Sequence, residues 1–179
     1  MHEAVEQLAR ILPGPHRSEA KNWSAVESAL GTGLPADYKE FIEAIGGGYL
    51  DGYLYVLEPD CPNVHYDLAE TSEERADAFE YLWDGGEERP DELNDTGARL
   101  IPFATTDNGE FLFWLARPGQ DADEWTVMVN EARGDWWERF DLTFVPFLLG
   151  VLTGALRSDI LSSGFPSTPS TFESFNLLG

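Results

Sequence analysis

The feature of the sequence that most constrains its fold is a helix pattern ending in three consecutive glycines. Residues 34–52 read LPADYKEFIEAIGGGYLDG. The apolar residues recur at i, i+3, i+4 and i+7, which places them on one stripe of a helix; they are Tyr38, Phe41, Ile42 and Ile45. Pro35 suits the first helical turn, where its missing N–H leaves no hydrogen bond unmade. The glycines end the helix, and we expect Gly46 at its C-terminal cap with a positive φ angle.

After the glycines, the sequence changes to the aromatic and β-branched content that is typical of strands. Strands are predicted at 49–57, 99–104, 110–116 and 125–131, with a further one at 136–142. Helical spacing predicts two helices before residue 34, one at 67–83 and a mostly apolar one at 143–154. Because strands and helices do not alternate as βαβ units, the sequence predicts an α+β fold. Its antiparallel sheet of about four to six strands packs against N-terminal helices and a C-terminal helix.

A length of 179 residues predicts one domain with a core of its own, and the 13% aromatic content supports a packed interior. We place this domain at 1–157. Residues 158–179 form a tail rich in Ser, Thr and Pro in which apolar residues such as Phe165 and Phe172 are scattered. We expect this tail to pack back in part on the domain.

Charge excludes several classes of partner. The chain has 33 acidic residues against 11 Lys and Arg, with a formal net charge of −22. Direct binding of nucleic acid needs clustered Lys and Arg, which the sequence lacks, and an anionic membrane surface would be repelled. Fifteen acidic residues lie between Asp51 and Asp95, where only Arg75 and Arg89 are basic. Two explanations stay open for this segment: a solvated helix face, and a docking surface for a cationic protein.

The helix predicted at 67–83 gathers much of this charge on one side. Its carboxylates recur at three- and four-residue spacing and are Glu70, Glu73, Glu74, Asp77 and Glu80. The same helix carries Leu68, Phe79, Leu82 and Trp83 as apolar anchors. Together with Glu58 and Asp60, the five helix carboxylates form the predicted acidic, partner-binding face.

The sequence offers little catalytic chemistry. The histidines are scattered, and no Cys or His pattern with metal-ligand spacing is present. Cys61 and His65 are four residues apart, but Pro62 between them disfavours a shared helix face, and no third residue orients the pair. We therefore predict a protein that is not an enzyme and has neither a metal nor a cofactor. One cysteine, no signal-peptide pattern and no spanning apolar run predict a cytoplasmic protein.

Three parts of the sequence form a recognisable set: LPADYKEFI from Leu34 to Ile42 with the glycines that follow, IPF at 101–103 with the turn at 107–109, and the closing region with residues 125–129, Trp137, Phe140 and Phe147. Together they resemble the SUKH superfamily, which includes cell-wall-assembly regulators and bacterial toxin-immunity proteins. Glu110 stands where an Asp is more usual. The resemblance spans roughly 20–155, and leaves the acidic insert at 58–98 and the tail unexplained. Its signature residues are Leu34, Pro35, Tyr38, Phe41, Gly46, Gly47, Asn108, Gly109, Trp137, Phe140 and Phe147.

The resemblance implies a compact domain that binds other proteins. In many bacterial members it implies an immunity protein that blocks a cognate toxin, often a nuclease. The predicted partner is a cognate toxin or another basic protein, and a monomer is favoured. The alternative is a general protein-interaction module in regulation or cell-envelope assembly. The signature residues themselves are expected to determine the fold, so the recognition surface lies elsewhere.

Overall fold

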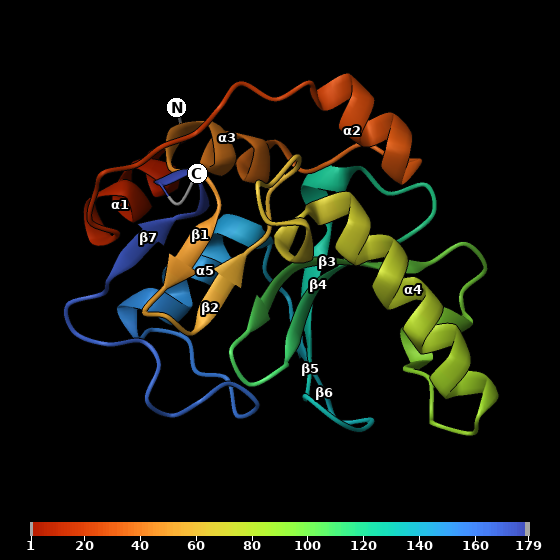
Figure 1. The fold of residues 1–179 in the computed structure, drawn as a ribbon. Helices are drawn as coiled ribbons and strands as arrows, with labels where there is room; N and C mark the ends of the chain where they lie inside the picture. Colours follow the sequence, from red (N-terminus) through yellow and green to blue (C-terminus); the bar gives the residue numbers. More distant parts are fainter. Residues whose placement is uncertain (1, 178–179) are drawn as a thin grey trace.

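The computed structural model describes residues 2–177, which form an antiparallel sheet with helices on both faces (Figure 1). The strands are β1 (Gly48–Leu50), β2 (Leu54–Val56), β3 (Arg99–Thr106), β4 (Phe111–Ala116), β5 (Thr126–Asn130), β6 (Trp137–Phe140) and β7 (Phe172–Ser174). The α-helices are α1 (Glu3–Ile11), α2 (Trp23–Leu30), α3 (Ala36–Ala44), α4 (Leu68–Asp84) and α5 (Phe144–Thr153). Short 3₁₀ helices are η1 (Val64–Tyr66), η2 (Asp91–Asn94), η3 (Ala122–Glu124) and η4 (Phe175–Leu177).

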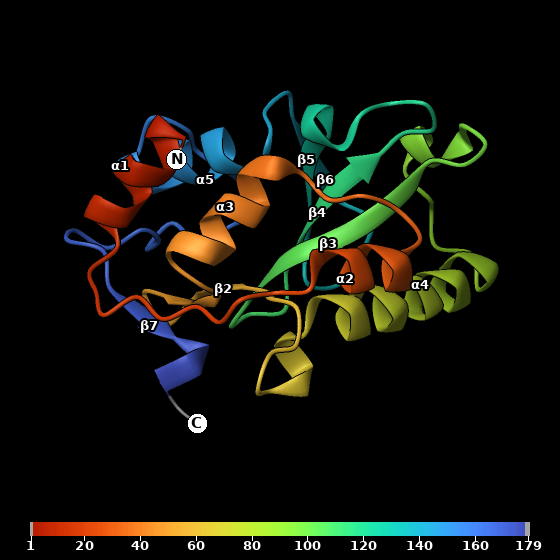
Figure 2. The same ribbon diagram turned by 90° about the horizontal axis from the view of Figure 1, so that it is seen from above.

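The sheet order is β6-β5-β4-β3-β2-β1-β7, and every neighbouring pair is antiparallel. Figure 2 shows α1, α3 and α5 on one face of the sheet and α4 on the other. The α+β prediction is confirmed. Residues 2–177 contribute seven strands to this sheet, one more than the upper limit of the predicted range of four to six.

Helix α3 is the helix predicted from the opening pattern. Pro35 is its N-cap, one position before the first helical residue, and Ile45 is its C-cap. Gly46 follows with φ +87° and donates its N–H to the Phe41 carbonyl at 3.3 Å, so the predicted positive φ is confirmed one residue beyond the cap. A Cβ on Gly46 would lie 2.4 Å from the Arg17 carbonyl oxygen, so glycine is required for space as well as for conformation.

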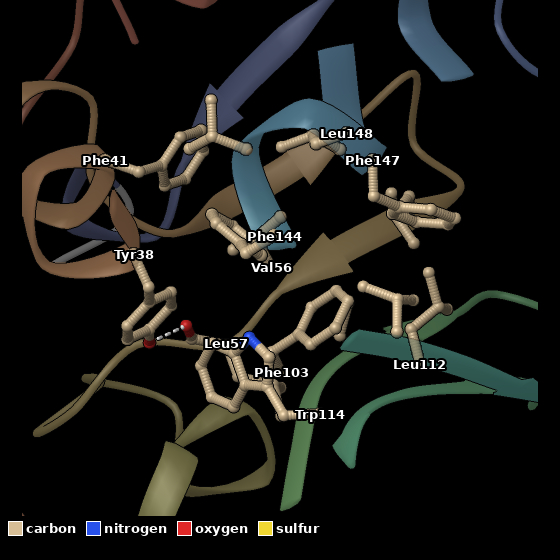
Figure 3. Packing of buried hydrophobic residues seen from close by; sticks show 14 of the residues in the cluster. Tyr38, Phe41, Val56, Leu57, Phe103, Leu112, Trp114, Phe144, Phe147 and Leu148 are labelled. Carbon is tan, nitrogen blue, oxygen red and sulfur yellow. Dashed lines mark hydrogen bonds between the residues drawn. The ribbon is translucent and has the colours of Figure 1, made fainter. Parts of the chain in front are cut away.

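The face of α3 that the sequence predicts to be buried lies in the main core. Tyr38, Phe41 and Ile45 are fully buried. Phe144 of α5 packs between the rings of α3 and the sheet, with its ring centroid 5.3 Å from that of Tyr38 and 5.1 Å from that of Phe103 (Figure 3). The Tyr38 hydroxyl donates to the Leu57 carbonyl at 2.6 Å, which satisfies the one polar atom of this buried side chain.

Asp37 connects the signature helix to α5. Its carboxylate accepts hydrogen bonds from the Val145 N–H at 2.9 Å and from the Tyr38 N–H at 2.8 Å. Val145 lies in the first turn of α5, whose N–H groups have no partner within the helix. Burial raises the pKa of Asp37, against the effect of these two hydrogen bonds. The signature motif therefore caps the C-terminal helix as well as filling the core.

The segment 49–57 is a hairpin and not the single strand predicted. The chain reverses at Asp51 and Gly52, which have φ angles of +56° and +61°, and Tyr53 donates its N–H to the Leu50 carbonyl at 3.0 Å. Positive φ at both central residues is the requirement of a type I′ turn, for which Asp-Gly is a preferred pair. The sequence therefore contained a turn signal inside the apolar run.

The other signature residues also lie at structural positions. Asn108 and Gly109 form the exposed turn between β3 and β4, where Gly109 has φ +95°. Phe140 and Phe147 pack together with ring centroids 5.1 Å apart on the face of α5. Trp137 packs on the opposite face of the sheet, in a second apolar cluster with Phe79, Phe113, Leu115 and Met128. The strands at the centre of the sheet are therefore buried on both faces.

The tail predicted at 158–179 is described as far as residue 177, its last two residues lying outside the described part of the chain, and it supplies the seventh strand. β7 pairs with β1, with Phe172 opposite Leu50 and Ser174 opposite Gly48. The carboxylate of Asp51 accepts hydrogen bonds from the backbone and side chains of Ser167 and Thr171. The sheet therefore continues beyond residue 157, the boundary placed from the sequence.

Candidate protein-binding surface

Helix α4 covers part of the second face of the sheet, and its buried residues fix its orientation. Asp67 caps the helix by accepting from the Glu70 N–H at 3.0 Å. Leu68 and Phe79 are buried beneath the helix. The guanidinium of Arg75 lies over the Phe79 ring at 5.2 Å and over the Phe111 ring of β4 at 4.7 Å. These contacts leave the opposite side of α4 facing solvent.

The exposed side of α4 carries the carboxylates that the sequence predicts on one helix face. All five are exposed, and we call them the acidic stripe: Glu70, Glu73, Glu74, Asp77 and Glu80. Within residues 2–177, none of them forms an ion pair. Asp60 is also exposed, but it lies in the loop after β2 with φ +55° and not on α4. The structure thus presents five free carboxylates along one helix.

Two large apolar side chains at the C-terminal end of α4 are more exposed than the sequence suggests. Leu82, predicted as a buried anchor, is 38% exposed, so that prediction is wrong. Tyr81 is 81% exposed and continues the acidic stripe, one turn beyond Asp77. Both side chains line a surface hollow with Asp84 and Glu87. Helical spacing from Asp77 was the signal that could have added Tyr81 to the predicted face.

Glu58 is the one predicted face residue that the structure removes from the surface. Its side chain is 0% exposed, so it is not available to a partner and its assignment to the acidic face is wrong. The Lys21 Nζ lies 3.5 Å from its carboxylate, and this lysine side chain is only 3% exposed. The Asn176 Nδ2 donates to Glu58 Oε1 at 2.8 Å, and the Gly47 N–H lies 3.5 Å from Oε2.

The buried carboxylate of Glu58 joins three segments that are distant in sequence. Lys21 precedes α2, Gly47 follows α3, and Asn176 lies in η4, 118 residues after Glu58. We call Lys21, Glu58 and Asn176 the tail anchor. Burial raises the pKa of Glu58, against the opposing effects of Lys21 and Asn176. Part of the acidic excess between residues 51 and 95 therefore holds the tail in place and is not a partner surface.

The candidates for catalytic chemistry remain isolated groups. Among residues 2–177, no group of three or more His, Cys, Asp or Glu is arranged to hold a metal ion. Burial raises the pKa of the Cys61 thiol to about 11, which disfavours the thiolate that a nucleophile requires. In the same part of the chain, no helix has both the length and the apolar content needed to cross a bilayer.

The structure is a small α+β domain in which α4 presents an exposed row of carboxylates. Residues 19–145 match the model of the SMI1 / KNR4 family (SUKH-1), and the chain therefore belongs to this family. No curated protein and no solved structure matches the chain significantly. The family match confirms the resemblance inferred from the LPADYKEFI stretch and the turn at 107–109.

Proposed function

We propose that this chain is a non-enzymatic immunity-type protein that binds and neutralises a cationic toxin domain through the acidic stripe of α4. The observation that carries the proposal is the row of five exposed carboxylates that have no ion-pair partner within residues 2–177. Membership of the SUKH-1 family supports a role in protein binding. The buried Glu58 has no part in this surface.

The chemistry of the stripe suits a nuclease as the target. A nuclease holds phosphates with Lys and Arg, and residues three or four apart on a helix face have Cβ atoms about 5–6 Å apart, which places their carboxylates in a row. Such a row of negative charges imitates a phosphate backbone and occupies the same basic groups. Because the stripe is exposed, its attraction to a basic partner extends only about 8 Å at physiological ionic strength. The proposal therefore predicts fast association that slows strongly with salt.

The test begins with identification of the partner. The chain is cross-linked in its own host, the captured protein is identified and purified, and its binding to the chain is measured by stopped flow at several salt concentrations. The test variant combines Glu73→Gln, Glu74→Gln, Asp77→Asn and Glu80→Gln. The matched control makes the same charge change at exposed positions off α4: Glu3→Gln, Glu19→Gln, Glu124→Gln and Asp141→Asn.

We expect the α4 variant to associate at least tenfold more slowly with a reduced salt dependence, while the control variant shows a much smaller change. Protection against the toxin should fall in parallel. Equal association rates for the two folded variants would exclude the acidic stripe as the docking surface. A captured partner that has no toxic activity would favour the alternative function, a protein-interaction module in regulation or cell-envelope assembly.

A further inference from the structure

A row of side chains crosses the face of the sheet on which α4 lies. Strand registry places Glu173 of β7 opposite Tyr49, Tyr49 opposite Tyr55, Tyr55 opposite Thr105 and Thr105 opposite Phe111. Directly opposed residues of antiparallel strands share one face of the sheet. The row therefore begins at an exposed carboxylate, crosses two tyrosines and ends at the phenylalanine beneath α4.

The two ends of this row are covered differently. At Phe111, helix α4 places the guanidinium of Arg75 4.7 Å from the ring centroid. At Tyr49 and Tyr55, Figure 1 shows no α-helix in front of β1 and β2. Both tyrosines remain partly exposed. The chain thus supplies its own arginine to Phe111 at one end of the row, whereas the two tyrosines receive no such cation from the described residues and remain partly exposed.

Tyr66 of η1 joins the two strand tyrosines, and we call Tyr49, Tyr55 and Tyr66 the tyrosine cluster. Their ring centroids lie 4.9 Å (Tyr49 to Tyr55), 5.7 Å (Tyr49 to Tyr66) and 5.2 Å (Tyr55 to Tyr66) apart, with the rings close to perpendicular. The buried ring of Phe175 stacks on Tyr66 and supports the cluster from the tail. This packing fixes the rings, so a partner would lose little side-chain entropy in contacting them.

Carboxylates border the cluster. The Tyr55 hydroxyl donates to Asp107 Oδ1 at 3.0 Å, and both Asp107 and Glu173 are exposed. Burial, and then the hydrogen bond to Asp107, raise the pKa of Tyr55 to about 12, so its hydroxyl stays protonated and donates. Among the described residues, the cations that lie over rings are Lys39 on Trp23 and Arg75 on Phe79 and Phe111. The tyrosine cluster carries no such cation from this chain.

We propose that the tyrosine cluster receives an arginine side chain of the cationic partner, stacked on a tyrosine ring and paired with Asp107 or Glu173. Arginine fits better than lysine, because its planar guanidinium stacks on aromatic faces and pairs with a carboxylate through two N–H groups. Two strands away, the guanidinium of Arg75 over the Phe111 ring is an example within this chain of the cation-to-ring contact. The inference takes the cationic partner from the proposed function, but it assigns recognition to a surface separate from the acidic stripe.

The test uses two defined probes and the full chain. Acetylated, amidated hexapeptides in which Gly alternates with Arg, or Gly with Lys, carry equal charge and are titrated into the protein while its tyrosine ring signals are followed by NMR. We expect the Arg peptide to shift the Tyr49, Tyr55 and Tyr66 signals and to bind about two- to fivefold more tightly than the Lys peptide, the range of an exposed cation–π contact.

Variants separate the ring face from the hydroxyl and the charge. Tyr55→Leu should abolish the preference for Arg, whereas Tyr55→Phe, which keeps the ring, should retain it. Trp136→Leu is the matched control, since Trp136 is 50% exposed, directly precedes β6, and lies outside both the tyrosine cluster and the acidic stripe. If Tyr55→Leu fails to fold, Asp107→Asn in the exposed turn provides a second test, because loss of a paired carboxylate should weaken the Arg peptide selectively.

Equal affinity for the two peptides, shifts confined to α4, or an unchanged Arg preference in Tyr55→Leu would each overturn the inference. Failure here is distinguishable from failure of the proposed function. Suppose that the variant neutralised at Glu73, Glu74, Asp77 and Glu80 loses the captured partner while wild type shows no Arg preference. The acidic stripe is then supported as the docking surface, and the tyrosine cluster is refuted as an Arg site. If that variant keeps its partner and Tyr55→Leu binds the partner more weakly, the tyrosine cluster is supported and the acidic stripe is refuted.

Discussion

The tail anchor and the acidic stripe are both built on carboxylates of the same acidic segment, yet the fold uses them in opposite ways. Glu58 is fully enclosed and paired with Lys21 and Asn176. Glu73 and Glu74, less than twenty residues later, are exposed and have no ion-pair partner within residues 2–177. Local charge density therefore does not distinguish a structural carboxylate from one available to a partner.

The difference follows from what each carboxylate meets in three dimensions. Glu58 follows the buried residues Val56 and Leu57, and a charge in that position is stable only when a cation and hydrogen-bond donors reach it. The stripe lies on a helix whose opposite side already packs on the sheet, so its charges stay in water. Partner groups decide the role of Glu58, and helix orientation decides the role of the stripe.

The largest predicted effect comes from removing the cation of the tail anchor. Lys21→Met leaves Glu58 buried without its ion partner, which should lower the free energy of unfolding by about 3–5 kcal/mol. Urea denaturation measures this loss. Arg10→Met is the control, since the Arg10 to Glu6 pair on α1 is exposed and should contribute less than about 1 kcal/mol. Similar stabilities for the two variants would show that the anchor behaves like a surface pair.

A smaller loss is predicted for the second carboxylate that holds the tail. Asp51→Asn removes the charge that accepts hydrogen bonds from Ser167 and Thr171, and should cost about 1–3 kcal/mol. Asn tolerates positive φ as Asp does, so the turn itself should survive. Asp60→Asn is the matched control, because Asp60 also has positive φ but is exposed in a loop. Thermal unfolding that ranks the two variants equally would contradict the prediction.

The two tail carboxylates should respond to pH with opposite signs. Partial burial opposes ionisation of Asp51, but the bonds from Ser167 and Thr171 outweigh it and hold its pKa below 3.8. Its contribution is therefore present at neutral pH and is lost as pH falls below 3.8. The pKa of Glu58 is raised above 4.5 by burial, so the folded state holds this proton more tightly and stability falls as pH rises above 4.5.

These signs are measured as differences between wild type and variants across pH. The stability advantage of wild type over Asp51→Asn should shrink toward low pH, and its advantage over Glu58→Gln should shrink as pH rises above 4.5. Urea titrations between pH 3 and pH 7 give both curves. If both stability differences changed with pH in the same direction, the opposite pKa shifts assigned to Asp51 and Glu58 would be refuted.

The smallest effect on stability is predicted for the acidic stripe itself. Neutralising Glu73, Glu74, Asp77 and Glu80 should change the free energy of unfolding by no more than about 0.5 kcal/mol per site, with relief of like-charge repulsion favouring the variant slightly. Circular dichroism with urea denaturation checks this. A large loss of stability would mean that these carboxylates support the fold, as Glu58 does. The acidic stripe and the tail anchor would then no longer differ in their contribution to stability.

Features that depend on local patterns could be predicted from the sequence. The stripe of Tyr38, Phe41 and Ile45, the left-handed Gly46 and the turn at Asn108 and Gly109 each follow from residues a few positions apart. The hairpin at Asp51 and Gly52 was missed although its signal was present, because the apolar residues around it continue from Tyr49 to Leu57 as one strand would. Leu82 was misplaced because helical spacing alone does not set how far a helix extends past the sheet.

Features that depend on distant contacts could not be predicted. The burial of Glu58 requires Lys21 and Asn176, and no residue near Glu58 in the sequence indicates that these two are its partners. β7 has three residues in a segment rich in Ser, Thr and Pro, so its pairing with β1 has no periodic signal. The tyrosine cluster likewise forms only when the hairpin, η1 and η4 meet. Tertiary partners, and not propensity, determine these parts of the molecule.

The pairing of β7 with β1 also fixes an order of events during protein synthesis. Thr171, which leads into β7, is made 120 residues after Asp51, which directly follows β1. At about 5–20 residues per second, roughly 6–24 s pass between the emergence of the two partners from the ribosome. During that interval the outer edge of β1 has no neighbour and is a template for pairing with another nascent chain. Because β1 has only three residues and begins with Gly48, this unpaired edge is short until β7 has been synthesised and can pair with it.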